Sequence, residues 1–241
     1  IGLCATMGHS SIPVVKRLKV AIISTGDELR QPGDKLERGE IYESNSFGLS
    51  GLVKWLGHHP VRMHCVGDTL DSLRESLNTA AKDCDLILTS GGVSMGEWDL
   101  VRKIMEDEGD IHFWRVKLRP GSPPLFGLWG DTPIFGLPGN PVSSHVVFRI
   151  LVAPWIRNTT SATGPIEARA FARLATKVKP TKDSLTLRRV TIEVTKDGLV
   201  AHQKIHQGSA NLASIAYSEG MVVLQPECDY SIGDMVEVII L

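Results

Sequence analysis

Several common sequence signatures are absent from this chain. No apolar run approaches the roughly 20 residues that a helix needs to cross a bilayer. The formal net charge is -1, whereas chains that bind nucleic acid usually carry a basic excess. We therefore expect neither a membrane nor a nucleic acid as a partner. The content of 42% hydrophobic and 22% charged residues is ordinary for a soluble globular protein.

The cysteines and histidines lack the spacing of a disulfide framework or a zinc site. The four cysteines include no C-x-x-C pair, so we predict buried free thiols, which are typical of the reducing cytoplasm where we expect the protein to be located. His58 and His59 are adjacent, and His202 and His206 have no third ligand nearby in the sequence, which argues against zinc. The cysteines are Cys4, Cys65, Cys84 and Cys228.

The glycine-rich turns match neither a Walker-type G-x-x-x-x-G-K nor a dinucleotide G-x-G-x-x-G motif. The sequence also contains no internal repeat and no low-complexity segment. Its first residue is not methionine and the following residues do not form a signal peptide, so we expect the chain to be a piece of a longer protein.

From Lys19 to about Asn158, apolar runs alternate with segments of helical periodicity. Runs such as 20–23 and 86–88 predict buried strands. Strands that alternate with helices are typical of a doubly wound, mostly parallel sheet with both faces covered. The sequence therefore predicts an α/β domain over residues 17–160. The predicted helices are 49–56, 70–81, 100–105 and one that follows Pro141 and continues to Leu151.

The pattern changes after a stretch of small residues, 159–165, which predicts a linker. Beyond it, strands such as 168–176 and 186–194 follow one another with few helical patterns between them. About 75 residues of this kind suit a small β-barrel, which we predict over residues 165–241. Residues 1–16 are too few for a domain and are predicted to be the remnant of a preceding N-terminal domain.

Four turns are predicted to meet at one edge of the sheet, because ligands of open α/β sheets bind beyond the carboxyl ends of the strands. They combine acids, bases and glycine-rich main chain, which suits a phosphorylated ligand with a bridging Mg²⁺. The hydroxyls of Ser94 and Ser143 are better suited to bind phosphate oxygens than to act as nucleophiles without a nearby base. The turns are Thr25–Glu28, Ser90–Asp99, Lys117–Gly121 and Gly136–Ser143.

Each of these turns, taken alone, also has a purely structural explanation. Glycines permit tight turns, aspartates cap helices, and alternating basic residues line a solvated strand edge. Asn140 followed by Pro141 is a good start for a helix. Their occurrence at successive strand ends is what favours a shared ligand site.

Five segments occur in an order that resembles the molybdopterin molybdenumtransferase family, which includes MoeA and the gephyrin E domain. The resemblance runs through nearly the whole chain and is weaker in the last 75 or so residues. It implies a molybdopterin-binding α/β domain followed by a β-barrel domain, the third and fourth domains of that family. The segments are Ser24–Leu29, Gly39–Asn45, Ser90–Asp99, Arg119–Gly121 and Gly136–Ser143.

The resemblance implies a transferase of molybdenum cofactor biosynthesis. Such an enzyme inserts molybdate into adenylylated molybdopterin, with Mg²⁺-dependent release of AMP, to form molybdenum cofactor. The acid that matches Asp99 is needed for hydrolysis of the adenylate. Members of the family are dimers, so we expect a homodimer, with a molybdopterin adenylyltransferase as a further partner.

The resemblance and the turns together assign residues to three groups. The catalytic residues are Asp99, Asp27 and Glu28, and Asp99 and Asp27 are also the metal ligands. The predicted molybdate ligands are Lys117, Arg119, Ser143, Arg189 and Ser209, with Arg189 favoured over its neighbour Arg188. The pterin nucleotide is expected to contact Thr25, Gly26, Ser44, Asn45, Ser90, Gly91, Gly92, Ser94, Gly96, Pro138, Gly139 and Asn140.

Two positions depart from the family pattern. The turn after Arg119 commonly reads Pro-Gly-Lys-Pro, but Ser122 replaces the lysine here and removes one cation from the expected anion pocket. Glu43 stands where aspartate is usual, one methylene longer. Two other functions stay open: a molybdopterin adenylyltransferase, whose stand-alone forms lack the β-domain, and a non-catalytic, gephyrin-like scaffold, against which the acidic and basic loops argue.

Overall fold

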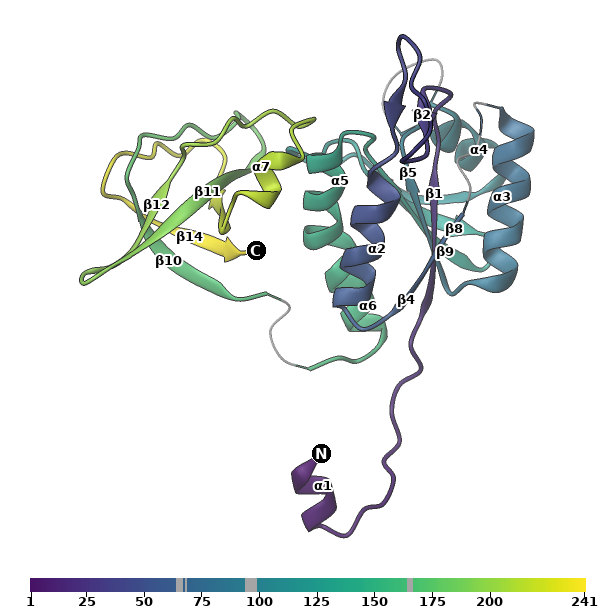
Figure 1. The fold of residues 1–241 in the computed structure, drawn as a ribbon, viewed down its shortest axis with the longest axis horizontal. Helices are drawn as coiled ribbons and strands as arrows, with labels where there is room; N and C mark the ends of the chain where they lie inside the picture. The colour runs from purple at the N-terminus through teal and green to yellow at the C-terminus, as the bar shows by residue number, and fades with distance from the viewer. Residues whose placement is uncertain (64–66, 68, 94–98, 164–166) are drawn as a thin grey trace.

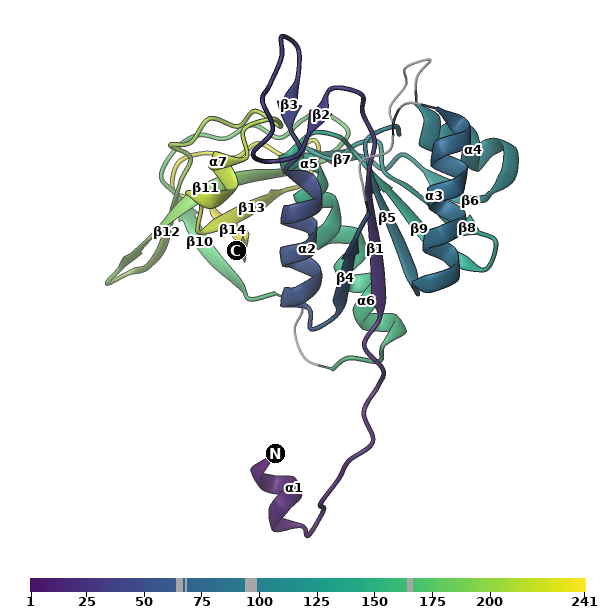
Figure 2. The same ribbon diagram turned by 45° about the vertical axis from the view of Figure 1, so that its right-hand side comes forward.

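The computed structural model describes residues 1–63, 67, 69–93, 99–163 and 167–241 (Figure 1). An α/β unit comes first in the chain and a β-barrel follows it, so the predicted fold class is confirmed. Before the first strand, helix α1 (Gly2–Thr6) and an extended segment lead away from the body of the molecule (Figure 1 and Figure 2). The role of residues 1–16 as the remnant of a preceding domain stays a prediction.

The α/β unit contains a six-stranded sheet. Strands β4, β1, β5 and β9 are parallel, and two antiparallel pairings add β8 and β6 at one side. Strands β1 and β5 are buried over nearly their whole length, as expected in the middle of a sheet that is covered on both faces. In sheet order the strands are β4 (His59–Arg62), β1 (Lys19–Ser24), β5 (Leu86–Ser90), β9 (Thr132–Leu137), β8 (Leu125–Trp129) and β6 (Asp110–Trp114).

Alternate residues of the central strands enter two separate apolar clusters, because successive strand residues face opposite sides of a sheet. Ile22 and Leu88 belong to the cluster under α2 and α5, and Ile23 and Ile87 to the cluster under α3 and α4. The helices therefore cover both faces, as Figure 2 shows. Their bounds are α2 (Asn45–Trp55), α3 (Leu70–Asp83), α4 (Leu100–Glu108) and α5 (Pro141–Val147).

The helix predicted after Pro141 is not one regular α-helix. After α5, a π-helical turn covers Phe148–Val152, and α6 (Ala153–Thr159) continues from it. Pro154 stands in the first turn of α6 and has no N–H to donate, which interrupts the regular hydrogen-bond ladder at this point. The apolar periodicity located the helical segment but carried no signal for the π-turn.

The β-barrel is a closed ring of five strands. Closure pairs every strand on both sides and so removes the exposed edges of an open sheet. Val190, Ala201, Val222 and Val238 lie in its apolar centre. In ring order the strands are β11 (Leu185–Thr195), β12 (Gly198–His202), β10 (Arg169–Leu174), β14 (Met235–Ile240) and β13 (Gly220–Leu224), which pairs with β11 again.

The barrel packs directly against the α/β unit. Strand β7 (Leu118–Arg119), which comes from the α/β unit, pairs in parallel with β11. Leu187, Met221 and Ile239 of the barrel join the apolar cluster that contains Leu118 and α5. In Figure 1, α2, α5 and α6 stand between the barrel and the sheet. The two units therefore share part of one apolar core.

A short parallel pair projects beyond the carboxyl end of β1, at the top of Figure 1. It consists of β2 (Leu29–Arg30) and β3 (Ile41–Tyr42), and we call residues 28–43 the flap. Arg30 pairs with Glu40 at 2.5 Å between Nη2 and Oε1, which ties the two strands of the flap together.

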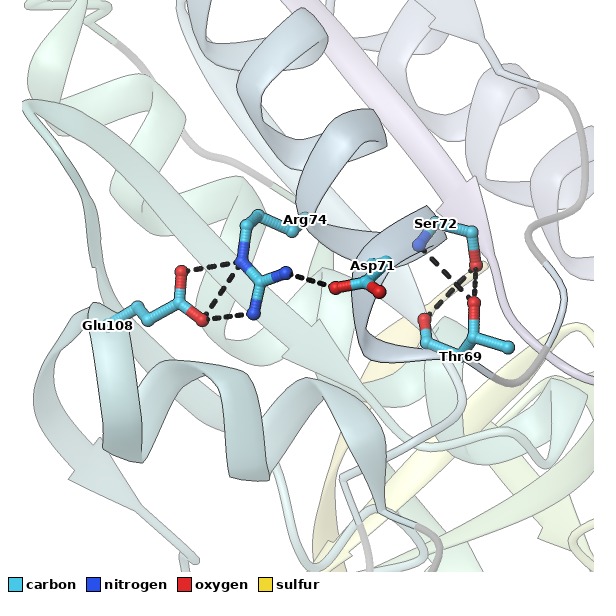
Figure 3. A network of polar contacts seen from close by, with 5 residues as sticks. All are labelled: Thr69, Asp71, Ser72, Arg74 and Glu108. Atoms are coloured by element: carbon cyan, nitrogen blue, oxygen red, sulfur yellow. Dashed lines mark hydrogen bonds and ion pairs between the residues drawn. The ribbon is translucent and has the colours of Figure 1, made fainter.

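Helix α4 is held to α3 by one arginine (Figure 3). Arg74 on α3 donates through Nε and Nη2 to the carboxylate of Glu108 on α4, at distances from 2.6 to 3.0 Å, and through Nη1 to Asp71 at 2.5 Å. These hydrogen bonds to Arg74 lower the pKa of Glu108. Thr69 caps α3 by accepting from Ser72 N at 3.3 Å. Arg74 therefore fixes the C-terminal end of α4, at Glu108, to α3.

The predicted free thiols are confirmed for the described cysteines, but their predicted burial is wrong for Cys228. Cys228 is exposed because it lies in the turn between β13 and β14, and turns run over the surface. Cys4 and Cys84 are partly buried, and Cys65 lies outside the described residues. Within the described ranges, no helix is long and apolar enough to cross a membrane.

A buried ion pair between the two units should contribute strongly to stability. Nη1 of Arg149 lies 2.5 Å from Oε1 of Glu167, and these side chains are 9% and 4% exposed. Arg149→Leu would leave the carboxylate of Glu167 buried without its cation, so we expect the free energy of unfolding in urea to fall by ~3–5 kcal/mol. Arg169→Ala, which breaks an exposed pair with Glu237, should cost less than ~1 kcal/mol. Similar losses in both variants would contradict this prediction.

Candidate functional site

A cavity of about 740 Å³ opens at the carboxyl ends of β1, β5 and β9. This is the edge at which open α/β sheets bind ligands. Its walls come from the loops that follow these strands, from the flap, from the start of α2 and from the barrel segment around α7 (Ala213–Ala216). Both units of the chain therefore contribute to one cavity.

Most of the predicted ligand-binding residues line this cavity. They are Thr25, Gly26, Glu28, Ser44, Asn45, Ser90, Gly91, Gly92, Asp99, Pro138, Gly139, Asn140 and Ser143. Ser94 and Gly96 lie outside the described residues. The remaining predicted residues, which the described cavity wall does not include, are Asp27, Lys117, Arg119, Arg189 and Ser209.

The loop after β5 brings main chain into the cavity wall. Gly91 and Gly92 have φ angles of +99° and +66°, in the left-handed region that favours glycine. A Cβ on Gly91 would stand 2.9 Å from both the carbonyl oxygen and Oγ1 of Thr25. Thr25 N donates to Ser90 O at 3.1 Å, so the loops that follow β1 and β5 meet main chain to main chain. Glycine at position 91 is what allows this approach.

The side chain of Asn45 joins two of these loops. Its Nδ2 donates to Oγ of Ser90 and to the carbonyl oxygen of Gly139, both at 2.7 Å. Asn45 is the first residue of α2, so one amide connects the start of this helix to the loops after β5 and β9. The arrangement fixes the spacing of the glycine-rich walls.

Asp99 and Asn140 precede helices, yet neither side chain serves as a helix cap. Asp99 stands at the N-cap position of α4 and Asn140 at that of α5, and neither makes a side-chain capping hydrogen bond. Both line the cavity. A helix-capping role, which the sequence left open for these two residues, is therefore not the role of their side chains.

The two acids of the turn after β1, Asp27 and Glu28, lie near different parts of the chain. Glu28 lines the cavity, and its Oε2 lies 2.5 Å from the position that a Cβ on Gly26 would occupy. Asp27 instead places Oδ1 3.4 Å from the position of a Cβ on Gly67. Among the described residues, no group of three or more His, Cys, Asp or Glu side chains is arranged to hold a metal ion.

Arg189 and Ser209 are both connected to barrel segment 207–212. Ser209 O accepts from Val142 N at 3.1 Å, and the next residue, Ala210, lines the cavity. Nη2 of Arg189, on β11, donates to Gly208 O at 3.3 Å. Neither Arg189 nor Ser209 belongs to the described cavity wall.

Arg189 is a buried cation, only 1% exposed. Burial and, second, the charge of Arg188 lower the pKa of its guanidinium to about 10. Within the described part of the chain, its Nε is buried without a hydrogen-bond partner. A buried guanidinium with an unused donor favours a nearby anion, which supports the choice of Arg189 as an anion-binding residue.

Lys117 and Arg119 are exposed on the segment that pairs with the barrel. Lys117 O accepts from Leu185 N at 2.9 Å, and Arg119 is the second residue of β7. The same segment does reach the cavity further on, because Ser122 and Pro123 line it. The role of Lys117 and Arg119 as molybdate ligands stays a prediction.

A small annex of about 20 Å³ opens beside the main cavity and is lined in part by His145. The annex and the cavity share Ser44, Asn45, Pro141 and Leu212. Nε2 of His145 accepts from Nε of Arg149 at 2.9 Å. Burial and, second, the charge of Arg149 lower the pKa of His145 to about 4, so this ring is neutral at pH 7.

Sequence reasoning missed several residues of the cavity wall. They are Ser24, Leu29, Ile41, Tyr42, Glu43, Val93, Leu100, Ser122, Pro123, Pro141, Ala210 and Leu212. The motif Gly39–Asn45 was a usable signal for Ile41, Tyr42 and Glu43, since it contains two residues that were predicted. Ala210 and Leu212 come from the barrel, and no local pattern indicated that this segment folds over the α/β unit.

Both units of the chain match described protein families. Residues 21–158 match the family described as "Probable molybdopterin binding domain", and residues 172–241 match the "MoeA C-terminal region (domain IV)". The chain is 32% identical over 227 residues to a molybdopterin molybdenumtransferase of Haemophilus influenzae, covering 93% of this chain and 56% of that protein. It is 36% identical over 199 residues to molybdopterin molybdenumtransferase 2 of Mycobacterium tuberculosis, covering 80% and 49%.

A solved structure agrees with these relatives. The molybdopterin biosynthesis MoeA protein of Pyrococcus horikoshii superimposes with a TM-score of 0.85 at 29% identity, over 99% of this chain and 58% of that one. The chain therefore spans about half the length of the relatives it matches.

Gly91→Ala should destabilise the protein. The added Cβ would meet Thr25 at 2.9 Å in a backbone region that alanine rarely adopts, so we expect a loss of ~1–3 kcal/mol in the free energy of unfolding in urea. Gly48→Ala is the matched control, because Gly48 lies inside α2 with nothing within 4 Å of an added Cβ. That variant should gain ~0.5–1 kcal/mol. A neutral Gly91→Ala would show that the loop does not need glycine.

Stability should fall on acidification through His145. The unfolded ring binds a proton near pH 6.5 but the folded one only near pH 4, so the unfolded state binds more protons between these values. The stabilisation is therefore complete above pH 6.5 and is lost as the pH falls toward 4. His145→Gln should reduce the difference in unfolding free energy between pH 7 and pH 4 by up to ~3 kcal/mol. His9→Gln, in the exposed N-terminal segment, should leave it unchanged; an unchanged slope in His145→Gln would refute the assignment.

Proposed function

The chain belongs to the MoeA family, and from this premise we propose that it is a molybdopterin molybdenumtransferase. It acts on adenylylated molybdopterin and molybdate and yields molybdenum cofactor and AMP. The observation that carries this proposal is the single cavity in which glycine-rich main chain, the bridging amide of Asn45 and the carboxylate of Asp99 meet. Because the chain spans about half the length of its relatives, its activity and its partners are part of the proposal.

The residues of the cavity suit the phosphates of a nucleotide. The loop at Gly91 and Gly92 lines the cavity with left-handed backbone, and turns of this kind form concave surfaces that bind anions. The hydroxyls of Ser44, Ser90 and Ser143 line the same cavity and supply further polar contacts. We assign these groups to binding the pterin nucleotide.

The carboxylates present fit a magnesium ion. Mg²⁺ prefers oxygen ligands and is often held by one or two carboxylates together with substrate phosphates. Asp99 and Glu28 both line the cavity and would hold it there, with Asp27 adjacent to Glu28 in the chain. When bound, the ion supplies stabilisation of negative charge on the leaving phosphate.

Asp99 separates cleavage of the ligand from its binding. Asp99 lines the cavity, where a carboxylate can accept hydrogen bonds but adds negative charge beside a phosphate. Such a group weakens simple phosphate binding, so its useful role is to orient the oxygen that attacks the adenylate phosphorus. The attacking oxygen is that of a water molecule: a new P–O bond forms at the adenylate phosphorus as the P–O bond to the molybdopterin phosphate breaks. AMP leaves with the water oxygen, the phosphate stays on molybdopterin, and the protons of the water pass to solvent.

Molybdate, the second substrate, is assigned to the barrel side of the cavity. It is a tetrahedral oxyanion, and cations with hydroxyl groups suit it. Ser143 lines the cavity, Ser209 directly precedes the lining residue Ala210, and Arg189 is hydrogen-bonded to Gly208 of the same segment. Lys117 and Arg119 are the further cations proposed for this substrate.

We also propose a homodimer in the cytoplasm that receives its substrate from a molybdopterin adenylyltransferase. The match of residues 172–241 to the MoeA C-terminal region favours the molybdenumtransferase over the adenylyltransferase itself. Nothing observed in the cavity specifically favours the adenylyltransferase or the non-catalytic scaffold.

Replacing Asp99 by asparagine tests the proposed reaction. Incubated with adenylylated molybdopterin, molybdate and Mg²⁺, the unmodified protein should release AMP, and Asp99→Asn should do so roughly 100-fold more slowly or worse. Nucleotide binding measured by calorimetry should be retained, because the main-chain loops are unchanged. Asp107→Asn, an exposed acid on α4, serves as the control and should have full activity. No AMP release by the unmodified protein would overturn the proposed function, and full activity of Asp99→Asn would remove Asp99 from it.

A further inference from the structure

Glu43 is a buried carboxylate in the cavity wall to which the proposed reaction assigns no role. The residue is 2% exposed. Its Oε1 accepts from Ser24 Oγ at 3.0 Å and from Ser46 N at 2.7 Å, and its Oε2 accepts from Ser46 Oγ at 2.6 Å. Burying a carboxylate is unfavourable unless such donors replace the water that it loses. The surrounding chain is therefore organised around this side chain.

A cation stands behind the network. Ser46 Oγ accepts from Nε of Arg62 at 2.9 Å, and the guanidinium of Arg62 lies 3.4 Å from the centre of the Phe47 ring. Because Ser46 Oγ accepts from Arg62, its own proton is directed at Glu43. The Ser46 hydroxyl thus accepts from the Arg62 guanidinium and donates to the Glu43 carboxylate.

Glu43 also replaces the normal helix cap of α2. The N-cap residue, Ser44, makes no capping hydrogen bond with its side chain, whereas Glu43 accepts from the N–H of Ser46 in the first turn. The first N–H groups of a helix need partners from outside the helix. Because Glu43 supplies one, the hydroxyl of Ser44 is left in the cavity wall.

Asn45 lies between the residues that this network holds. Glu43 is two residues before it, Ser46 directly after it, and Ser24 ties both to the end of β1. The amide of Asn45 in turn bridges the loops at Ser90 and Gly139. A displacement of Glu43 would therefore reach both glycine-rich loops through one residue.

We propose that Glu43 is a positioning residue. It fixes the start of α2 against β1, so that the amide of Asn45 holds the loops at Ser90 and Gly139 at the spacing that a nucleotide phosphate needs. The identity of the ligand rests on the proposed function, whereas the coupling of Glu43 to the two loops is a property of this chain alone.

Glu43→Gln tests the proposal, since glutamine keeps the size of the side chain but replaces one accepting oxygen by an NH2 group, which would face either the two donors at Oε1 or the one at Oε2. We expect hydrogen exchange of the segments around Ser90 and Gly139 to become faster, and AMP to bind about tenfold more weakly, a change equal to about 1.4 kcal/mol. Glu37→Gln, an exposed acid on the flap, is the matched control and should change neither. Ser24→Ala, which removes one donor, should show the same effects at smaller size if Glu43→Gln does not fold.

A double-variant cycle decides whether Glu43 acts through Asn45. If it does, Glu43→Gln combined with Asn45→Ala should weaken AMP binding no more than Asn45→Ala alone. Additive losses would overturn the proposal. A lower melting temperature with unchanged exchange at Ser90 and Gly139 would also overturn it, because Glu43 would then be only a helix cap. If the unmodified protein does not bind AMP, the proposed function loses support, while hydrogen exchange still decides the role of Glu43.

Discussion

Burial of the central strands on both faces is the constraint on which this structure depends. Strands β1 and β5 place apolar residues into two separate clusters, so nearly every position along them is committed to packing. Polar groups can then stand only where the strands end. Ser24 and Ser90 are the last residues of their strands, and each begins the hydrogen bonding that builds the cavity. The location of the site follows from the core.

Hydrogen bonding at the strand ends separates support from ligand contact. The carboxylate of Glu43 and the hydroxyls of Ser24 and Ser46 satisfy one another in the interior. By contrast, Asp99 and Asn140 stand at N-cap positions without using their side chains as caps. The groups that satisfy one another in the interior hold the cavity walls in place.

The sequence predicted the α/β unit, the barrel and most of the cavity wall because these depend on local pattern. Two-face burial makes continuous apolar strands, and the rule that ligands bind beyond the strand ends then located the turns at Thr25, Ser90 and Gly139. The π-turn after α5 was missed, since it depends on one missing N–H at Pro154 rather than on periodicity. The prediction of buried cysteines failed at Cys228 because a turn, and not the residue type, decides its exposure.

What the sequence could not predict is where long-range contacts direct a side chain. Asp27 and Glu28 are adjacent acids, and only the fold shows that Glu28 lines the cavity while Asp27 lies toward Gly67. Lys117 and Arg119 were expected at the anion pocket, but the main chain of this segment is hydrogen-bonded to β11 of the barrel. Of residues 207–212 only Ser209 was predicted, through the family resemblance; Ala210 and Leu212 gave no local signal, because the position of this segment is set by contacts with α5 and β11.

Because the barrel contacts the α/β unit beside the cavity, its residues can contribute to the chemistry of the site. A sheet edge with acids and glycine-rich loops suits phosphate and a metal ion, but no lysine or arginine lines the described cavity wall. Arg189 on β11 is a buried cation that donates to Gly208 in the barrel loop, and the main-chain bond from Val142 to Ser209 holds this loop against the start of α5. Shared apolar packing through Leu118 and Leu187 joins the two units at the same boundary. The position of the Arg189 guanidinium relative to the cavity therefore depends on both units at once.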